Sequence, residues 1–232
     1  MAFGSTEFLI ALVEIVWVNI LLSGDNAMVI AMAARSLPDN QRRKAIVIGS
    51  AAAIAMRIGL VLVAAELLRL PWLKLIGAAA LVYIGTSLLL PEGGDSKVKH
   101  HGSMIAAIRT IMLADLIMSL DNVVAVAAAS MGSTTLLILG LAISIPLVIF
   151  GATLLLGVIE RFPIIVWLGA ALLGFIAGEM LVGDPALQSE AQRLNAAVGL
   201  NAHQLGLVAG AHGALLVLAL GKALLWRRQA VQ

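Results

Sequence analysis

Seven long apolar stretches follow one another along this chain of 232 residues. A helix needs about 20 mostly apolar residues to cross roughly 30 Å of hydrocarbon, and each stretch is long enough to do so. The stretches are Phe8–Ala34, Ala45–Leu68, Trp72–Leu90, Met104–Ser130, Thr135–Ile159, Ile164–Val182 and Gln204–Trp226. We therefore predict an all-α, polytopic membrane protein with seven transmembrane helices.

The amino-acid composition excludes most other classes of protein. Hydrophobic residues make up 61% of the chain and charged residues only 12%, about half of the charged fraction of an ordinary soluble domain. So little polar surface excludes a soluble enzyme, a disordered tail and a nucleic-acid-binding protein. A transmembrane barrel would alternate polar and apolar residues along its strands, and these runs do not. Cysteine is absent, so disulfides and thiolate metal ligands are excluded.

Basic residues are distributed unevenly between the predicted loops. With the N-terminus outside, eleven of the fifteen Lys and Arg residues fall on the inner side and three on the outer side, while Arg57 falls within the second span. Cytoplasmic loops carry such an excess of positive charge. We therefore expect the N-terminus outside and the C-terminus in the cytoplasm. The opening residues MAFGSTEF lack the basic stretch of a cleavable signal peptide, and we expect none.

The chain contains an internal repeat. When Glu14–Ala34 is placed over Thr110–Ser130, the motif S-x-D-N coincides in both copies. We predict one three-helix repeat at residues 1–95, a second at 96–183, and an outer loop with a seventh helix at 184–232. Because three is an odd number, the second repeat enters the membrane upside down. Inverted repeats of this kind usually hold their substrate near the bilayer midplane.

Acidic residues lie where a bilayer disfavours them. Asp25, Asp115 and Asp121 fall deep within predicted spans, and Glu14 falls nearer the outer surface. A charged side chain at the bilayer centre costs about 2.5–3.5 kcal/mol on insertion scales. Arg57 lies at comparable depth and is the expected counter-ion. The three aspartates (−3) and Arg57 (+1) leave a charge of −2, which one divalent cation or two protons would neutralise. Protonated or paired structural carboxylates are the alternative, and the duplication of the motif disfavours them.

The spacing of these polar residues predicts two interrupted helices. Asn19 and Asp25 are six residues apart, as are Asp115 and Asp121. That spacing separates two side chains by about 240° around an unbroken helix, so they could not face one site. Breaks at SGDN and SLDN would let them converge and would free backbone carbonyls, as in discontinuous transporter helices. Gly24 favours the first break, whereas Leu120 supports the second less well.

The nearby donors predict the class of ion. Asn26 and Asn122 add amide oxygens to the carboxylates, and Ser23 and Ser119 add hydroxyls. Such hard oxygen donors suit Mg²⁺, Ca²⁺ or Mn²⁺, whereas zinc and copper prefer Cys or His. His212 is the one histidine within a predicted span, and we expect it to be packed or hydrogen-bonded.

Two further features have structural explanations. Glu179 and Asp184, near the outer end of the sixth span, could mark an exit mouth, but a snorkelling or solvated role explains them better. The pairs Gly174/Gly178 and Gly206/Gly210 form small-xxx-small faces, which allow helices to approach closely.

The motifs NILLSGDNAMVIAMAAR and DLIMSLDNVVAVAAA, in a seven-helix chain of this length, resemble those of the TerC family, within the LysE/TerC superfamily and closest to its YjbE-like branch. The resemblance implies a location in the bacterial inner membrane. It also implies export of manganese from the cytoplasm, or metal supply to secreted proteins. Carried over position by position, the implied metal ligands are Asp25, Asn26, Asp115, Asp121 and Asn122. Asn19 stands where the second copy has Asp115, so the two halves are chemically unequal.

The leading hypothesis is therefore a Mn²⁺-type divalent cation exporter that works by alternating access, with proton exchange as a natural coupling and no resident cofactor. Asn19, Ser23, Ser119, Glu14 and Arg57 are supporting residues. The main alternative is a membrane partner that transports nothing itself and serves metal-stress or tellurite resistance, or the metalation of secreted proteins. The expected partners are a divalent metal ion and the bilayer, with a homo-oligomer or the secretion machinery as further options. An intramembrane aspartyl protease is disfavoured, since LSGD lacks the first glycine of a G-x-G-D motif. An amino-acid exporter is disfavoured because the spans are too acidic for a zwitterion. Selectivity among Mn²⁺, Ca²⁺ and Mg²⁺ stays open.

Overall fold

The structure is a computed structural model that describes residues 5–21, 23–67, 70–90, 103–130 and 133–230. Within these ranges the side chains at 18–21, 62, 64–66, 121, 123–125, 127–129, 195–197 and 229–230 are not described. Asn19 and Asp121 therefore have a place on a helix, but their side chains lie outside the described residues. All regular secondary structure in the part of the chain that the structure describes is helical, as predicted.

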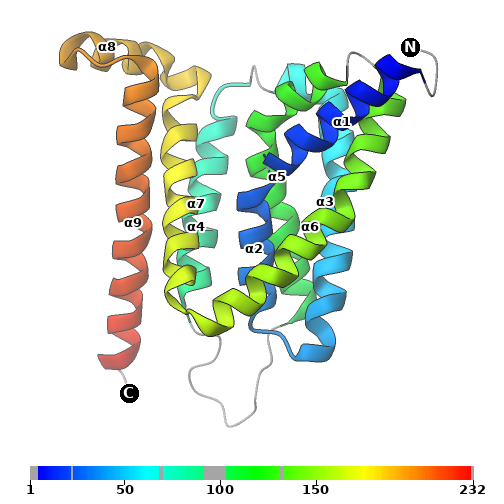
Figure 1. Cartoon of the computed structure of the whole chain (residues 1–232). Helices are drawn as coiled ribbons and strands as arrows, with labels where there is room; N and C mark the ends of the chain where they lie inside the picture. The colour runs from blue at the N-terminus through cyan, green and yellow to red at the C-terminus, as the bar shows by residue number, and fades with distance from the viewer. Residues whose placement is uncertain (1–4, 22, 68–69, 91–102, 131–132, 231–232) are drawn as a thin grey trace. The chain divides into compact units, whose positions relative to one another are not determined.

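The long helices overlap the predicted apolar stretches (Figure 1). They are α1 (Thr6–Leu21), α2 (Gly24–Ala34), α3 (Asp39–Leu67), α4 (Leu73–Leu89), α5 (Met104–Ala129), α6 (Thr134–Arg161), α7 (Ile164–Val182), the 3-10 turn η1 (Pro185–Leu187), α8 (Gln188–Val198) and α9 (Ala202–Ala230). Among the described residues, α3, α6, α7 and α9 are long and apolar enough to cross a membrane, and α4 is a shorter apolar helix. Several helices thus have the length and composition of membrane spans, and the count of seven stays a prediction.

The first predicted helix break is present and the second is absent. The first apolar stretch divides into α1, which ends at Leu21, and α2, which begins at Gly24 and runs in a different direction (Figure 1). The break at SGDN is thus confirmed. The break at SLDN is wrong, because α5 continues through Ser119–Asn122 without interruption. The physical reason is the residue inside the motif: Leu120 is a strong helix former, whereas glycine weakens a helix by about 1 kcal/mol relative to alanine.

The chain packs as two compact units. Unit 1 comprises Met1–Glu66 and Gly102–Arg161, and unit 2 comprises Leu67–His101 and Phe162–Gln232. Each unit takes helices from both predicted repeats, since α1, α2 and α3 join α5 and α6, whereas α4 joins α7 and α9. The inverted relation between the two repeats stays a prediction.

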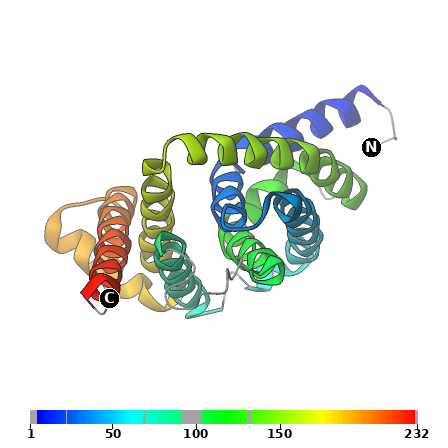
Figure 2. The same ribbon diagram turned by 90° about the horizontal axis from the view of Figure 1, so that it is seen from below.

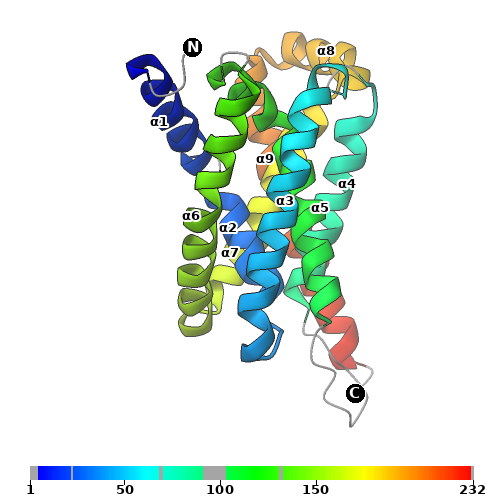
Figure 3. The same ribbon diagram turned by 90° about the vertical axis from the view of Figure 1, so that its right-hand side faces the viewer.

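In unit 1, α2, α3 and α5 lie side by side, and α6 packs against α1 and α2 (Figure 2). Figure 3 shows the same group from the side, with α6 beside α2 and α3 beside α5. A buried apolar cluster of Ile54, Val126, Leu137 and Leu141 joins α3, α5 and α6. These contacts fix the faces of α2, α3 and α5 that carry the polar residues.

In unit 2, glycines bring α7 and α9 into backbone contact. A Cβ atom at Gly174 would lie 2.4 Å from the carbonyl oxygen of Gly213, and one at Gly178 would lie 2.1 Å from that of Ala209. Gly210 approaches the ring of Phe175 similarly closely, whereas a Cβ at Gly206 meets nothing nearer than 4.0 Å. The close packing predicted for the small-residue faces is thus confirmed at Gly174, Gly178 and Gly210, whereas Gly206 has no such close contact.

The segment expected to be an outer loop contains a further helix, which the sequence analysis did not predict. Helix α8 (Gln188–Val198) lies between α7 and α9 and ends before Gly199, whose φ of 71° favours glycine. The signal that could have found it is the helical spacing of Leu187, Ala191, Leu194 and Val198.

Candidate cation site

A buried ion pair joins α3 to α5 in unit 1. The guanidinium of Arg57 donates through Nη2 to Oδ1 of Asp115, and the two side chains are only 3% and 7% exposed. The hydroxyl of Ser119, one helical turn along α5, donates to Oδ2 of Asp115 at 3.3 Å. The counter-ion role expected of Arg57 is therefore confirmed for Asp115.

Helical periodicity places these groups together. Ser50, Ala53, Ile54 and Arg57 follow one another at i, i+3, i+4 and i+7 and so share one face of α3. Asp115 and Ser119 are four residues apart on α5 and are neighbours for the same reason. The middle of α3 therefore presents one cation and one hydroxyl toward its partners.

A small cavity lies in front of this face. It is lined from α2 by Ser23, Asn26 and Ile30, from α3 by Ser50, Ala53, Ile54 and Arg57, and from α5 and α6 by Asp115 and Val148. Its volume is about 10 Å³, which is the space that one water molecule requires. The cavity can thus hold a single small particle, such as one water molecule or one dehydrated metal ion.

Three polar side chains in the cavity wall have no hydrogen-bond partner among the described residues. Ser23, Asn26 and Ser50 are 4%, 3% and 1% exposed, and their side-chain oxygens accept or donate no hydrogen bond within the described structure. Leaving a buried polar group unsatisfied costs about 1–3 kcal/mol, so such groups are rare in native proteins. Three of them lie around one cavity, where a single bound water molecule or ion could supply the missing interactions.

The remaining predicted ligands are placed differently. Asp25 lies half-buried in the first turn of α2, where its Oδ1 accepts a hydrogen bond of 2.8 Å from the backbone N–H of Asn26. Asn122 lies half-buried on α5, and Glu14 is exposed on α1 and does not line the cavity. Among the described side chains, no group of three carboxylates, histidines or cysteines is placed to hold a metal ion. A site with three carboxylates requires Asp121 and stays a prediction.

Ser50 is a cavity residue that the motifs did not indicate. It belongs to neither copy of S-x-D-N and carries no charge, so nothing marks it as a ligand when the sequence is examined for intramembrane acids. The available signal was its position seven residues before Arg57, which places it on the same face of the helix.

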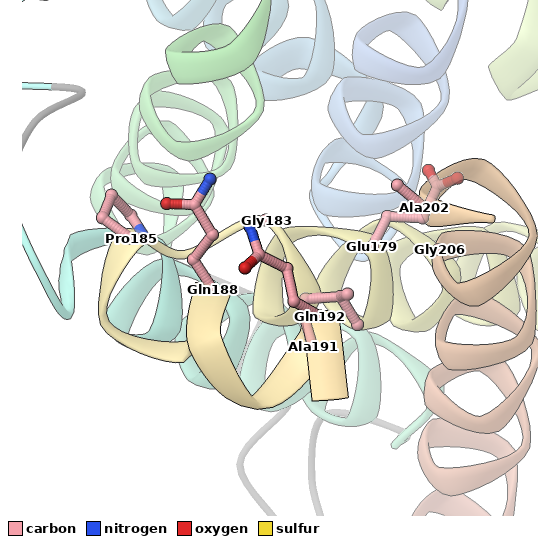
Figure 4. A pocket seen from close by; sticks show the side chains of 9 residues that line it. Glu179, Gly183, Pro185, Gln188, Ala191, Gln192, Ala202 and Gly206 are labelled. Atoms are coloured by element: carbon pink, nitrogen blue, oxygen red, sulfur yellow. The ribbon is translucent and has the colours of Figure 1, made fainter. Parts of the chain in front are cut away.

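A second, wider cavity of about 330 Å³ lies in unit 2 at the end of α7 (Figure 4). Glu179, Gln188 and Gln192 line it together with small residues of α9. Asp184 does not line this cavity; its carboxylate is fully buried and accepts backbone hydrogen bonds from Trp72 and Leu75 at the start of α4. The solvated role expected of Asp184 is therefore wrong.

His212 lies on α9, and its Nδ1 donates to the carbonyl oxygen of Val208, 2.7 Å away and one turn earlier. This contact confirms the expectation of a hydrogen-bonded histidine.

Sequence comparisons agree with the fold. The sequence profile described as "Integral membrane protein TerC family" matches residues 4–228. The chain belongs to the TerC family. No solved structure matches the chain.

Three proteins of Bacillus subtilis (strain 168) are similar to this TerC-family chain. The "Uncharacterized membrane protein YjbE" is 46% identical over 181 residues, which cover 78% of this chain and 83% of YjbE. The "Uncharacterized membrane protein YceF" is 30% identical over 170 residues, or 69% of this chain and 66% of YceF. The "Uncharacterized membrane protein YkoY" is 31% identical over 141 residues, or 54% of this chain and 43% of YkoY.

Proposed function

We propose that this protein exports a divalent cation across the bacterial inner membrane by alternating access, and that this cation is Mn²⁺. The observation that carries the proposal is the cavity of unit 1, beside the buried Arg57–Asp115 pair. There, Ser23, Asn26 and Ser50 have no hydrogen-bond partner within the part of the chain that the structure describes. Membership of a family of integral membrane proteins supports a transporter over a soluble protein.

The donor chemistry of the cavity favours a hard divalent cation. Hydroxyl and amide oxygens from Ser23, Asn26 and Ser50 and the carboxylate of Asp115 are ligands that Mn²⁺, Mg²⁺ and Ca²⁺ accept. The cavity has room for one small ion and no attached water. An ion in it would exchange its hydration shell for these protein oxygens.

The helix break next to the cavity adds to the argument. Helix α1 ends at Leu21 and α2 begins at Gly24, directly beside Ser23, Asp25 and Asn26. A helix end leaves carbonyl groups without partners inside the helix. Transporters use such broken helices to bind ions near the bilayer midplane.

Charge balance and coupling complete the proposal. Asp25, Asp115 and Asp121 together with Arg57 carry a net charge of −2 when all four are ionised, and one divalent cation neutralises this charge. With Asp115 paired to Arg57, the carboxylates of Asp25 and Asp121 can bind the two protons on the return step, and we propose proton exchange as the coupling. The outward direction follows from the family resemblance.

The decisive experiment is Mn²⁺ flux in liposomes that contain the purified protein and an entrapped Mn²⁺-sensitive dye. We expect protein-dependent flux, and a loss of at least about tenfold for Asn26→Leu, because an isosteric apolar side chain removes one oxygen ligand. Ser144→Ala is the matched control, since Ser144 is buried in the same unit but donates to the carbonyl of Gly140 at 2.9 Å and does not line the cavity.

The alternative function, a membrane partner that transports nothing itself, predicts a different result. Liposomes with folded wild-type protein would then show no more Mn²⁺ flux than empty liposomes. Such a result would refute the transport proposal. Equal flux through the wild type and Asn26→Leu would instead refute the assignment of the site.

A further inference from the structure

Asp115 has both carboxylate oxygens engaged by neighbouring side chains. Arg57 donates to Oδ1 and Ser119 donates to Oδ2. Arg57 and Asp115 also line the cavity, so a permanent positive charge forms part of the wall of the proposed cation site. A guanidinium keeps its proton throughout the physiological pH range.

This arrangement creates a competition for Asp115. A divalent cation in the cavity would lie beside the Arg57 guanidinium, and like charges repel strongly in a buried site of low dielectric constant. The cation can use Oδ1 of Asp115 only when Arg57 releases it. Arg57 and the transported ion therefore compete for the same carboxylate.

The competition matters for the return step of transport. An alternating-access transporter must reorient after it has released its ion, and an unpaired buried carboxylate makes the intermediate conformations unfavourable. We propose that Arg57 is a tethered counter-ion, which pairs with Asp115 when the site holds no cation and yields it when a cation binds. The empty transporter can then reorient without a proton on Asp115. This inference rests on the proposed function.

A merely structural ion pair makes a different prediction. Removal of a structural pair would impair every mode of transport equally, because the fold itself is affected. Removal of a tethered counter-ion impairs the return of the empty transporter. Net efflux includes that return step, whereas exchange of labelled Mn²⁺ for unlabelled Mn²⁺ uses only the loaded forms. The ratio of net efflux to exchange therefore separates the two roles.

The test measures both modes with ⁵⁴Mn²⁺ in liposomes that contain the full-length protein. For Arg57→Gln we expect net efflux to fall about tenfold or more, exchange to stay within about threefold of the wild type, and half-saturation of exchange to occur at a lower Mn²⁺ concentration. Arg57→Lys keeps the positive charge and should keep the wild-type ratio. A parallel loss of net efflux and exchange in folded Arg57→Gln would overturn the inference and leave the proposed function intact.

A second pair of variants guards against misfolding of Arg57→Gln. Asp115→Asn leaves Arg57 as an uncompensated cation in the cavity wall and should abolish Mn²⁺ binding. Asp115→Asn combined with Arg57→Gln removes both charges and should restore part of the binding. If the double variant binds Mn²⁺ no better than Asp115→Asn, the competition does not exist. If the wild type itself neither exports nor exchanges Mn²⁺, the proposed function fails, whatever the variants of Arg57 do.

Discussion

The carboxylate of Asp184, just beyond the end of α7, accepts a hydrogen bond of 2.9 Å from the backbone N–H of Trp72 at the start of α4. Its second oxygen accepts from the N–H of Leu75 at 3.0 Å. Trp72 itself has a left-handed conformation with φ of 71°, which is uncommon for a residue other than glycine. The carboxylate thus satisfies the first N–H groups of α4 and ties that helix to α7.

Replacing Asp184 should destabilise unit 2. Asp184→Asn keeps the shape of the side chain but loses the negative charge that four backbone N–H groups and the helix dipole stabilise. We expect a loss of about 2 kcal/mol in the free energy of unfolding, measured by thermal or chemical denaturation in detergent. Glu190→Gln is the control, because the exposed pair of Glu190 with Arg193 should contribute little.

The contribution of Asp184 should disappear in acid. Burial of the carboxyl opposes its ionisation, but hydrogen bonds from the backbone of Trp72, Ala186, Leu75 and Lys74 outweigh burial and hold the pKa of Asp184 below its ordinary value. A lowered pKa in the folded state stabilises the protein above the unfolded value of about 3.9, and this stabilisation is lost as the pH falls through the folded pKa. Melting temperatures of wild type and Asp184→Asn should therefore differ most near neutral pH and converge below about pH 4. A constant difference down to pH 2 would contradict the role of the charge.

The contact between α7 and α9 should not tolerate even one added methyl group. A Cβ at Gly178 would lie 2.1 Å from the carbonyl oxygen of Ala209, a backbone atom that cannot turn aside. We expect Gly178→Ala to lower the free energy of unfolding by about 2 kcal/mol. Gly206→Ala on the same interface meets its nearest atom at 4.0 Å and should change stability by less than about 0.5 kcal/mol. Equal effects of the two variants would show that close packing is not the cause.

Arg42 should hold one end of unit 1 together. Its guanidinium donates to the carbonyl oxygens of Leu37 at 2.7 Å and Arg35 at 3.0 Å, and it pairs with Glu160 at the end of α6. We expect Arg42→Lys to lose about 1–2 kcal/mol of stability, because one ammonium group cannot reach all three acceptors. Arg43→Gln, at an exposed neighbouring position, should melt like the wild type. Equal melting temperatures of Arg42→Lys and the wild type would show that the Arg42 guanidinium does not stabilise unit 1.

The sequence predicted those features that the bilayer itself imposes. A helix in hydrocarbon requires about 20 apolar residues, so the long helices were found. Some of their ends were not, since α3 begins at Asp39 and not at Ala45. A buried charge requires a partner, so the pairing of Arg57 with an intramembrane aspartate was also predictable. Which aspartate pairs with Arg57 depends on the packing of α3 against α5, and no local sequence pattern predicts that packing.

The failures have equally physical causes. The duplicated S-x-D-N motif suggested two broken helices, but only the first copy is broken. The two copies differ at the residue before the aspartate, which is Gly24 in the first copy and Leu120 in the second, and leucine favours a continuous helix. Ser50 was missed because what marks it is a buried hydroxyl without a partner among the described residues. That property arises from the tertiary packing, which no local sequence pattern predicts. Helix α8 was missed because it is short and largely polar, so it does not stand out between the apolar helices α7 and α9.

The thermal stability of a Ser50 variant should show whether the cavity binds Mn²⁺ at the expense of the stability of the metal-free protein. Its hydroxyl is buried, 1% exposed and without a partner among the described residues, so Ser50→Ala removes an unsatisfied polar group. Without metal, we expect this variant to be as stable as the wild type or up to about 1 kcal/mol more stable. Saturating Mn²⁺ should raise the melting temperature of the wild type, because a ligand that binds only the folded state stabilises it. The rise should be clearly smaller for Ser50→Ala. Ser144→Ala loses a satisfied hydrogen bond outside the cavity and should keep the full Mn²⁺-dependent rise. If Ser50→Ala were destabilised without metal yet gained the same protection from Mn²⁺, the hydroxyl would be a structural group and the ion would bind elsewhere.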